Sequence, residues 1–509
     1  MAFRSSIPRL RTLALALSLA VSPTLPQAQL PNMGDNSDMT TGDARRLGDR
    51  IARELYRDPD YLDDAVLTEY VQGIWQPLPA AARMRGEITP EIDERFAWEI
   101  LLSRDRAINA FARPGGYLGV FLGLIGLVST RDELASVLAH ELSHVTQRHI
   151  QRLMTRQSRQ MPLMLASMIL GALAASRSPQ AANALIVGGQ AAAMQSQLNF
   201  SRDMEREADR IGYGVATQAG FAPEGFVSMF DKLQQASRIN DNSSFPYLRN
   251  HPLTTERMAD MQSRAHFHAP GAGASNGAPT LEHALVAARA RVLSDVGVDT
   301  LRSWAAEPDG SSFASQPQAR RAAVLYAAAL AASRQRDPAA ARRHVARLLP
   351  EVQADSAAAR QAYLLGAEID LAAGDPAAAL ARLPVGRAKQ RPELTLSTQA
   401  LLGLKRGGEA VAPLQTWVAE HPRDAGAWML LAGACQAAGQ PLRAIRAEAE
   451  SHAAHLDFAA AVDRFKAGQD LSRRLGTAGG DYIEASIIDT RLRETQSRLR
   501  EQASERSLD

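Results

Sequence analysis

The sequence of 509 residues contains only one cysteine, Cys435. A lone cysteine cannot form a disulfide within the chain, so stability must come from packing and from any bound metal. We interpret Cys435 as a small buried side chain. No cysteine lies near the N-terminal apolar segment, residues 13–21, which argues against a lipid-anchored lipoprotein.

Two apolar segments come close to the length of a membrane-spanning helix, residues 13–21 and 161–175, and both are too short. Residues 13–21 follow three arginines with no acid and are too short to cross a bilayer, which is the pattern of a cleavable export signal. We predict a signal peptide over residues 1–28, with Ala20 and Ala28 both open as cleavage positions. Residues 161–175 form a 15-residue run without charge, again shorter than the roughly 20 residues of a spanning helix.

The sequence also has little net charge. The formal charge is +2, and loss of residues 1–28 with their three arginines changes it to −1. A nearly neutral exported chain has no excess of positive charge for a phosphate backbone. We therefore expect no nucleic-acid partner.

Against these absences stands one chemical motif, HELSH at residues 140–144. Residues four apart in a helix lie on one face, so His140 and His144 can direct two imidazoles at one metal ion. Glu141 lies between them, where it can take a proton from a metal-bound water without being a ligand. The motif predicts half of a metal site and its general base.

The surrounding residues 130–150 predict a helix without help from the motif. Apolar residues recur at spacings of three and four, and Thr130 followed by Glu133 is typical of a capping box. The alternative to a metal site is a pair of surface histidines on an amphipathic helix. That alternative loses weight if a third ligand exists.

An acid-rich segment, residues 201–212, offers that ligand. Glu205 and Asp209 are one helical turn apart and therefore share a face. A carboxylate can complete the site, and a second acid can accept the free N–H of a ligating histidine and fix its tautomer. Taken alone, such a segment would more often be a solvated helix face.

Between the signal and the motif we expect a helix over residues 43–78 and a strand over residues 96–102. Residues 108–121 place Pro-Gly-Gly between two strand-like pieces. A strand ending just before the metal helix would offer a free edge to an extended peptide. The alternative is an ordinary hairpin in which Phe111 fills the core.

Beyond residue 267 the composition changes. Residues 268–280 are rich in Pro, Gly and Ala and predict a linker. Breaker signals then recur at offsets of 38, 34 and 31 residues, at Asp337, Asp375, Glu409 and Gln440. A period near 34 is typical of tetratricopeptide repeats, whose concave face can hold a partner peptide. The alternative is that the helices only brace the first half.

HELSH, the spacing of Glu205 and Asp209, the strand motif that begins at Asn109, and His251-Pro252 followed by Arg257 together resemble the M48 family of zinc metallopeptidases. The resemblance implies one Zn²⁺ per chain, held by His140, His144 and Glu205.

The resemblance also implies a fold. We expect a mostly helical α+β protein, with a zincin-type metallopeptidase domain containing a small sheet over residues 29–267. A linker over residues 268–280 and an all-α tetratricopeptide-like solenoid over residues 281–509 would follow. Residues 161–193 would form a buried helical pair closing the cleft, or alternatively a mobile lid or a peripheral membrane contact.

The implied function is a periplasmic zinc endopeptidase that also assists outer-membrane protein assembly and quality control, as a chaperone does. Its partners would be unfolded or misassembled outer-membrane proteins and the barrel-assembly machinery, bound through the repeats. The alternative is a repeat scaffold or chaperone whose peptidase activity is latent or minor. Intact HELSH argues against complete loss of chemistry.

Three further residues receive roles in this comparison. Asn109 and Arg257 are expected to contact the substrate. His251 is expected either to stabilise the transition state or to occupy the open metal position and shut the enzyme off. Pro252 restricts His251 to extended backbone, which predicts a loop that can move.

Overall fold

The computed structural model describes residues 39–156, 179–239, 246–266, 277–294, 296–383, 390–479 and 481–506. Residues 37–509 group into one compact unit. The predicted signal peptide, residues 161–175 and most of the predicted linker lie outside the described residues. None of the described helices combines the length and the apolar character that crossing a membrane requires.

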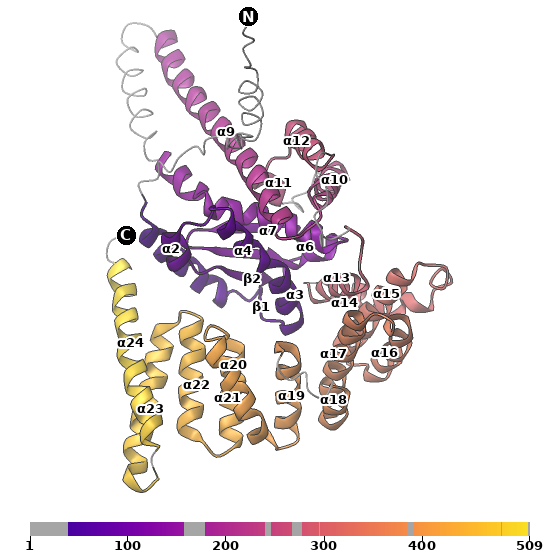
Figure 1. The fold of residues 1–509 in the computed structure, drawn as a ribbon, viewed down its shortest axis with the longest axis vertical. Helices are drawn as coiled ribbons and strands as arrows, with labels where there is room; N and C mark the ends of the chain where they lie inside the picture. Colours follow the sequence, from indigo (N-terminus) through magenta and orange to yellow (C-terminus); the bar gives the residue numbers. More distant parts are fainter. Residues whose placement is uncertain are drawn as a thin grey trace, which may run out of the picture. The chain divides into compact units, whose positions relative to one another are not determined.

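Short helices and strands come first (Figure 1). They are α2 (Thr41–Arg57), β1 (Tyr61–Leu62), α3 (Ala65–Trp75), α4 (Pro77–Met84), α5 (Pro90–Arg95), β2 (Glu99–Ser103), β3 (Ala110–Arg113), β4 (Tyr117–Phe121) and α6 (Leu122–Leu127). The expected helix over residues 43–78 is therefore wrong as a single element, because β1 interrupts it and Asp64 caps a new helix. The strand expected at residues 96–102 lies at Glu99–Ser103.

The four strands form one sheet in the order β1-β2-β4-β3. β4 pairs in parallel with β2 and antiparallel with β3 across the Pro-Gly-Gly turn, where Gly115 and Gly116 have φ values of 78° and 84°. β4, the strand that ends just before the metal helix in the chain, is paired on both sides, so the expectation of a free edge on that strand is wrong. The edge strands of the described sheet are β1 and β3, and β3 is the one that packs against α7.

The motif helix α7 (Arg131–Thr146) is buried along nearly its whole length. The alternative of an amphipathic helix with surface histidines is therefore wrong. Thr130 accepts a hydrogen bond from the Glu133 backbone, but the Glu133 carboxylate accepts from Ser129 rather than from Thr130, so the capping box is only half formed. Arg148 has a φ of 53°, which ends the helix before residues 149–156 turn helical again.

A long helix, α9 (Pro179–Gln218), packs against α7 and is followed by α10 (Glu224–Ile239), α11 (Pro246–Asn250) and α12 (Thr255–His266). A Cβ at Gly212 would lie 3.0 Å from backbone atoms of Ala139 and His140, so glycine permits the close approach of the two helices. The described part of residues 161–193 is the start of α9. Whether the whole stretch is a buried helical pair, a lid or a membrane contact stays a prediction.

The C-terminal half is helical throughout its described residues (Figure 1). Its elements are α13 (Leu281–Leu293), α14 (Val298–Ala306), η1 (Glu307–Asp309), α15 (Gln318–Arg334), α16 (Pro338–Val352), α17 (Ser356–Ala372), α18 (Pro376–Arg382), α19 (Arg391–Gly403), η2 (Gly407–Ala410), α20 (Val411–Glu420), α21 (Ala425–Ala437), α22 (Pro441–Ala454), α23 (Phe458–Gly479) and α24 (Tyr482–Arg506). The predicted fold class, mostly helical α+β with a small sheet, is confirmed.

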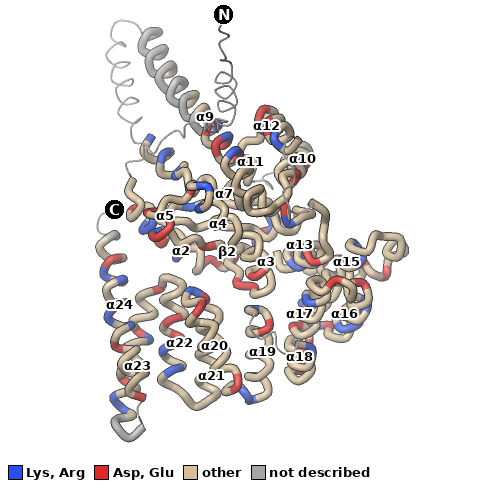
Figure 2. The backbone as a smooth tube through the Cα atoms, in the orientation of Figure 1, with Lys and Arg blue, Asp and Glu red and all other residues tan. Residues whose placement is uncertain are grey.

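Neighbouring helices of this half pack in sequence, as stacked helix pairs do. The breaker signals fall where the second helix of a pair begins: Asp337 and Asp375 cap α16 and α18, and Gln440 precedes α22. Lys and Arg are interspersed with Asp and Glu along these helices (Figure 2). The packing supports the prediction of repeats of the tetratricopeptide kind.

Helix α13 belongs to two hydrophobic cores. Val286 and Ala290 pack into the core that contains the sheet and α7, whereas Leu285 and Val292 pack into the core of α15 and α16. The predicted linker, residues 268–280, therefore ends directly before a helix that belongs to both halves.

Candidate metal centre

Three side chains from two helices meet between α7 and α9. The Nε2 atoms of His140 and His144 lie 3.0 Å apart, and each lies 3.4 Å from an oxygen of the Glu205 carboxylate. Ligand atoms bonded at about 2.0–2.1 Å to a tetrahedral metal lie about 3.3 Å from one another. The Glu205 carboxylate faces His140 with Oε2 and His144 with Oε1, so the three side chains are close enough to bind one metal ion together.

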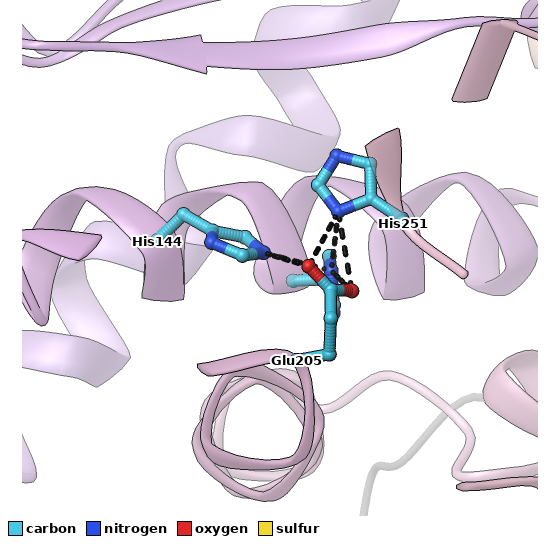
Figure 3. A group of neighbouring side chains, drawn as sticks. His144, Glu205 and His251 are labelled. Carbon is cyan, nitrogen blue, oxygen red and sulfur yellow. Dashed lines mark hydrogen bonds and ion pairs between the residues drawn. The ribbon is translucent and has the colours of Figure 1, made fainter. Parts of the chain in front are cut away.

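His251, in the loop between α11 and α12, joins this group. Its Nδ1 lies 3.3 Å from His140 Nε2 and 3.1 Å from Glu205 Oε1, and its ring stacks on Tyr247. Figure 3 shows Glu205 pointing from its helix toward both His144 and His251. All four ligand atoms lie within 4.8 Å of one another, so His251 is close enough to serve as a further ligand.

Asp209 supports the first histidine, as its spacing from Glu205 predicts. Its Oδ1 lies 2.9 Å from His140 Nδ1, on the side of the ring away from the cluster. Arg257 donates to both Asp209 oxygens at 2.6 and 2.8 Å and to the Pro252 carbonyl, and it lies 3.1 Å from Glu205. Arg257 is thus engaged by acceptors of the chain itself, and its expected contact with the substrate stays a prediction.

Two buried acceptors near the cluster have no hydrogen-bond donor among the described residues. They are the carboxylate of Glu141, which is 1% exposed, and the side-chain oxygen of Asn109. Glu141 Oε1 lies 3.4 Å from His251 Nε2. Asn109 directly precedes the free edge strand β3. Since buried acceptors rarely stay unpaired, both are positioned to accept a hydrogen bond from a bound water or substrate.

The electrostatics of the centre differ from one side chain to the next. Burial disfavours a charged imidazole, yet the contacts with Asp209 and Glu205 outweigh it and raise the pKa of His140 to about 10. Burial likewise opposes ionisation of Glu205, but His251 and His144 hold its pKa well below the usual value. Burial also lowers the pKa of the His144 imidazole well below its ordinary value, which keeps a nitrogen lone pair available.

The charge balance fits a divalent cation. Four carboxylates contact the histidines, and two arginines contact those carboxylates: Glu141, Glu205, Asp209 and Glu207, with Arg152 and Arg257. With neutral histidines this group carries a formal charge of −2, in a place where solvent is nearly excluded. A divalent metal would neutralise it, and the donor set of imidazole and carboxylate suits such an ion.

Sequence reasoning did not find one part of the centre, the contact of His144 with His149 and Glu207. His149 follows His144 by five residues, which is not a same-face spacing in a continuous helix. The break at Arg148 brings the two rings together. The signal in the sequence that could have indicated this contact is a further histidine directly after the motif helix.

Comparison with known proteins agrees with this geometry. The model of Peptidase family M48 matches residues 82–265, which contain every residue of the centre. A beta-barrel assembly-enhancing protease of Yersinia pestis is 30% identical over 430 residues, covering 84% of this chain and 84% of that protein. The chain belongs to peptidase family M48. It is a metallopeptidase with the predicted HExxH motif.

Other relatives share a shorter segment. The beta-barrel assembly-enhancing protease of Escherichia coli K12 is 33% identical over 243 residues, 47% of this M48 peptidase and 48% of the relative. A Vibrio cholerae relative is 32% identical over 310 residues, 59% of this chain and 61% of its own length. The chain thus spans less than two thirds of these two relatives.

Proposed function

We propose that the protein is a zinc-dependent endopeptidase in which His140, His144 and Glu205 hold the metal. The observation that carries the proposal is the buried, unpaired carboxylate of Glu141 beside the ligand atoms of His140, His144 and Glu205, which lie within 4.8 Å of one another. When bound, zinc lowers the pKa of a coordinated water and polarises the scissile carbonyl.

The side chains of the protein then divide the work. Glu141 accepts the proton of the attacking water and passes it to the leaving amine nitrogen. The unpaired edge of β3 can bind the substrate backbone as an added strand, and the Asn109 oxygen can accept a backbone N–H at the start of that edge. Asp209, held by Arg257, keeps His140 in the tautomer that ligates through Nε2.

The substitution Glu141→Gln tests the proposal. It removes the proton acceptor but keeps side-chain size, so cleavage of an unfolded protein substrate should fall by about 10²- to 10⁴-fold while zinc content stays at one per chain. Glu256→Gln, at an exposed acid of α12, is the matched control and should leave both unchanged. Full turnover in Glu141→Gln would exclude Glu141 as the base.

We further propose that His251 holds the enzyme inactive by default. The proposal is supported by its Nδ1, which lies 3.3 Å from His140 Nε2 and 3.1 Å from Glu205 Oε1 and could therefore take the position where water or substrate would have to bind. His251→Ala should then raise basal proteolysis, including self-cleavage. The competing role, stabilisation of the transition state, forecasts lower turnover with zinc retained. Unchanged rates on all substrates would exclude both roles.

For the biological role we propose a periplasmic protease with a chaperone-like part in outer-membrane protein assembly, which degrades stalled or misfolded clients. Two observations support it: the relatives are named beta-barrel assembly-enhancing proteases, and the helical half offers stacked pairs typical of peptide-holding repeats. The repeats would bind unfolded outer-membrane proteins and the assembly machinery.

The position of His251 keeps a second candidate open, a repeat scaffold whose peptidase activity is mostly latent. In vivo crosslinking from the repeat helices should capture outer-membrane proteins in either case. Loss of quality control in Glu141→Gln cells favours the protease, and retained function favours the scaffold.

A further inference from the structure

The second ligand histidine has its own support, built differently from that of the first. His144 Nδ1 lies 2.9 Å from His149 Nδ1. The other nitrogen of His149, Nε2, lies 3.0 Å from Glu207 Oε2, to which Arg152 donates at 3.1 Å. His149 is 2% exposed, and its ring stands edge-on to that of His144.

The tautomers of this chain follow from the metal ligand. If His144 ligates through Nε2, the neutral ring carries its proton on Nδ1, and that proton can be donated only to an acceptor. His149 Nδ1 must then accept, which places the His149 proton on Nε2. That proton faces the Glu207 carboxylate, which can only accept while ionised. Every group from His144 to Arg152 thus has one consistent role.

Behind the first ligand, His140, a similar series of contacts contains one residue fewer. His140 Nδ1 faces Asp209, and Arg257 binds Asp209 through two N–H groups. Each ligand imidazole therefore leads to a carboxylate held by an arginine, but a histidine is inserted in the chain behind His144. Packing alone does not require this, because an apolar ring of the same size would fill the space beside His144.

We propose that His149 is a positioning residue that orients the His144 ring and fixes its ligating tautomer by linking it to Glu207. The proposal rests on His144 being a metal ligand. A ligand ring without its outer partner is free to rotate and loses basicity, so the loss falls on metal affinity rather than on the fold.

The experiment compares His149→Phe and His149→Gln in the full-length chain. Phe keeps a ring in the buried space without hydrogen bonds, whereas the Gln amide can accept from His144 and donate to Glu207. Zinc competition with a chelator should show about a 10- to 100-fold loss of affinity in His149→Phe. His149→Gln should recover a large part of it.

The absorption spectrum of the cobalt-substituted protein supplies a second readout, which should shift in His149→Phe and return toward wild type in His149→Gln. His344→Phe, at a buried histidine of α16, controls for ring replacement and should leave affinity and spectrum unchanged. Far-ultraviolet circular dichroism of the metal-free proteins confirms that each variant folds.

The outcomes separate this inference from the proposed function. His144→Ala should abolish tight binding; if it does not, the ligand assignment fails. If His144→Ala fails to bind but folded His149→Phe keeps wild-type affinity and an unchanged cobalt spectrum, the positioning role is wrong. Equal losses in His149→Phe and His149→Gln would also overturn it, since the hydrogen-bond link would then be irrelevant.

Discussion

Carboxylates meet arginines in two regions of this M48 peptidase, and their surroundings differ. In the metal centre the side chains of Glu141, Asp209 and Glu205 are 1, 2 and 5% exposed. At the contact between the sheet-bearing half and the helical half, three arginines each bind one carboxylate from each half, namely Arg289, Arg360 and Arg391. The carboxylate of the first half is often partly exposed. Glu69 and Asp63 there are 29 and 31% exposed.

The two regions therefore balance charge by different means. Arg360 joins Glu69 to Glu393, and Arg391 joins Asp63 to Asp424, while water solvates what the arginine does not neutralise. The metal centre has no such access to water, so the two negative charges that it carries with neutral histidines are costly to bury. The comparison indicates that the charges of the inter-half contact are balanced by its own arginines and by water, whereas the metal centre needs a bound cation to balance its charge.

The largest effect should come from the metal itself. If the metal is present at about 1,000 times its Kd, chelation should lower the free energy of unfolding by about 4 kcal/mol. Glu205→Gln should lower affinity by at least tenfold, because a neutral amide replaces an anionic ligand, and it also removes one excess negative charge. Chelator should therefore shift its unfolding midpoint less than that of the wild type.

Unfolding curves with and without chelator, together with metal content after dialysis, measure this effect. Asp209→Asn, which keeps an acceptor near His140, should show a milder loss. Unchanged metal occupancy of Glu205→Gln under chelator would contradict the ligand assignment and the charge argument together.

An intermediate effect is expected at the contact between the halves. Arg289 of α13 is 4% exposed and binds Asp64, the cap of α3, and Glu368 of α17. Arg289→Met leaves Asp64 buried without its partner and should lower the free energy of unfolding by roughly 2–4 kcal/mol, less than for a fully buried pair because Glu368 is partly solvated. Chelator should not change the size of this loss.

Arg302→Met is the matched control. Its partner Asp299 is almost fully exposed, so the change should be less than about 0.5 kcal/mol. If Arg289→Met were equally harmless, the contact between the halves would carry little stability. The two halves could then fold independently, as the predicted linker suggests.

The sequence predicted what depends on local spacing. His140 and His144 share a face because they are four residues apart, and the same rule paired Glu205 with Asp209. Helix starts in the second half were visible because Asp337 and Asp375 carry side chains that cap backbone N–H groups.

What the sequence did not predict depends on contacts between distant segments. The position of Arg257 against Asp209 follows from the packing of α12 beside α9, which no periodicity encodes. The free edge lies on β3 rather than on β4, because β4 pairs in parallel with β2. That pairing depends on the crossover connection between β2 and β4. His149 was missed because a single positive φ at Arg148 breaks the helical spacing.

The smallest effect concerns the pH dependence of the contact between the halves. Asp424 caps α21 and accepts hydrogen bonds from Arg391 and from Trp417 Nε1. Burial opposes ionisation, but the hydrogen bonds and charge of Arg391 outweigh it and hold the pKa of Asp424 below its usual 3.8.

Between that lowered pKa and about 3.8 the unfolded chain binds more protons than the folded one. The stability contributed by Asp424 is therefore fully present above pH 3.8 and is lost as the pH falls through the folded pKa. Asp424→Asn should lower the free energy of unfolding by about 1 kcal/mol at neutral pH. Below pH 4 the free energies of unfolding of the wild type and the variant should differ less. Urea unfolding of both proteins from pH 3 to pH 7 measures that difference. The titration of the metal centre cancels in it because both proteins have the same centre. A difference that stays constant over this range would show that Arg391 does not stabilise the ionised form of Asp424.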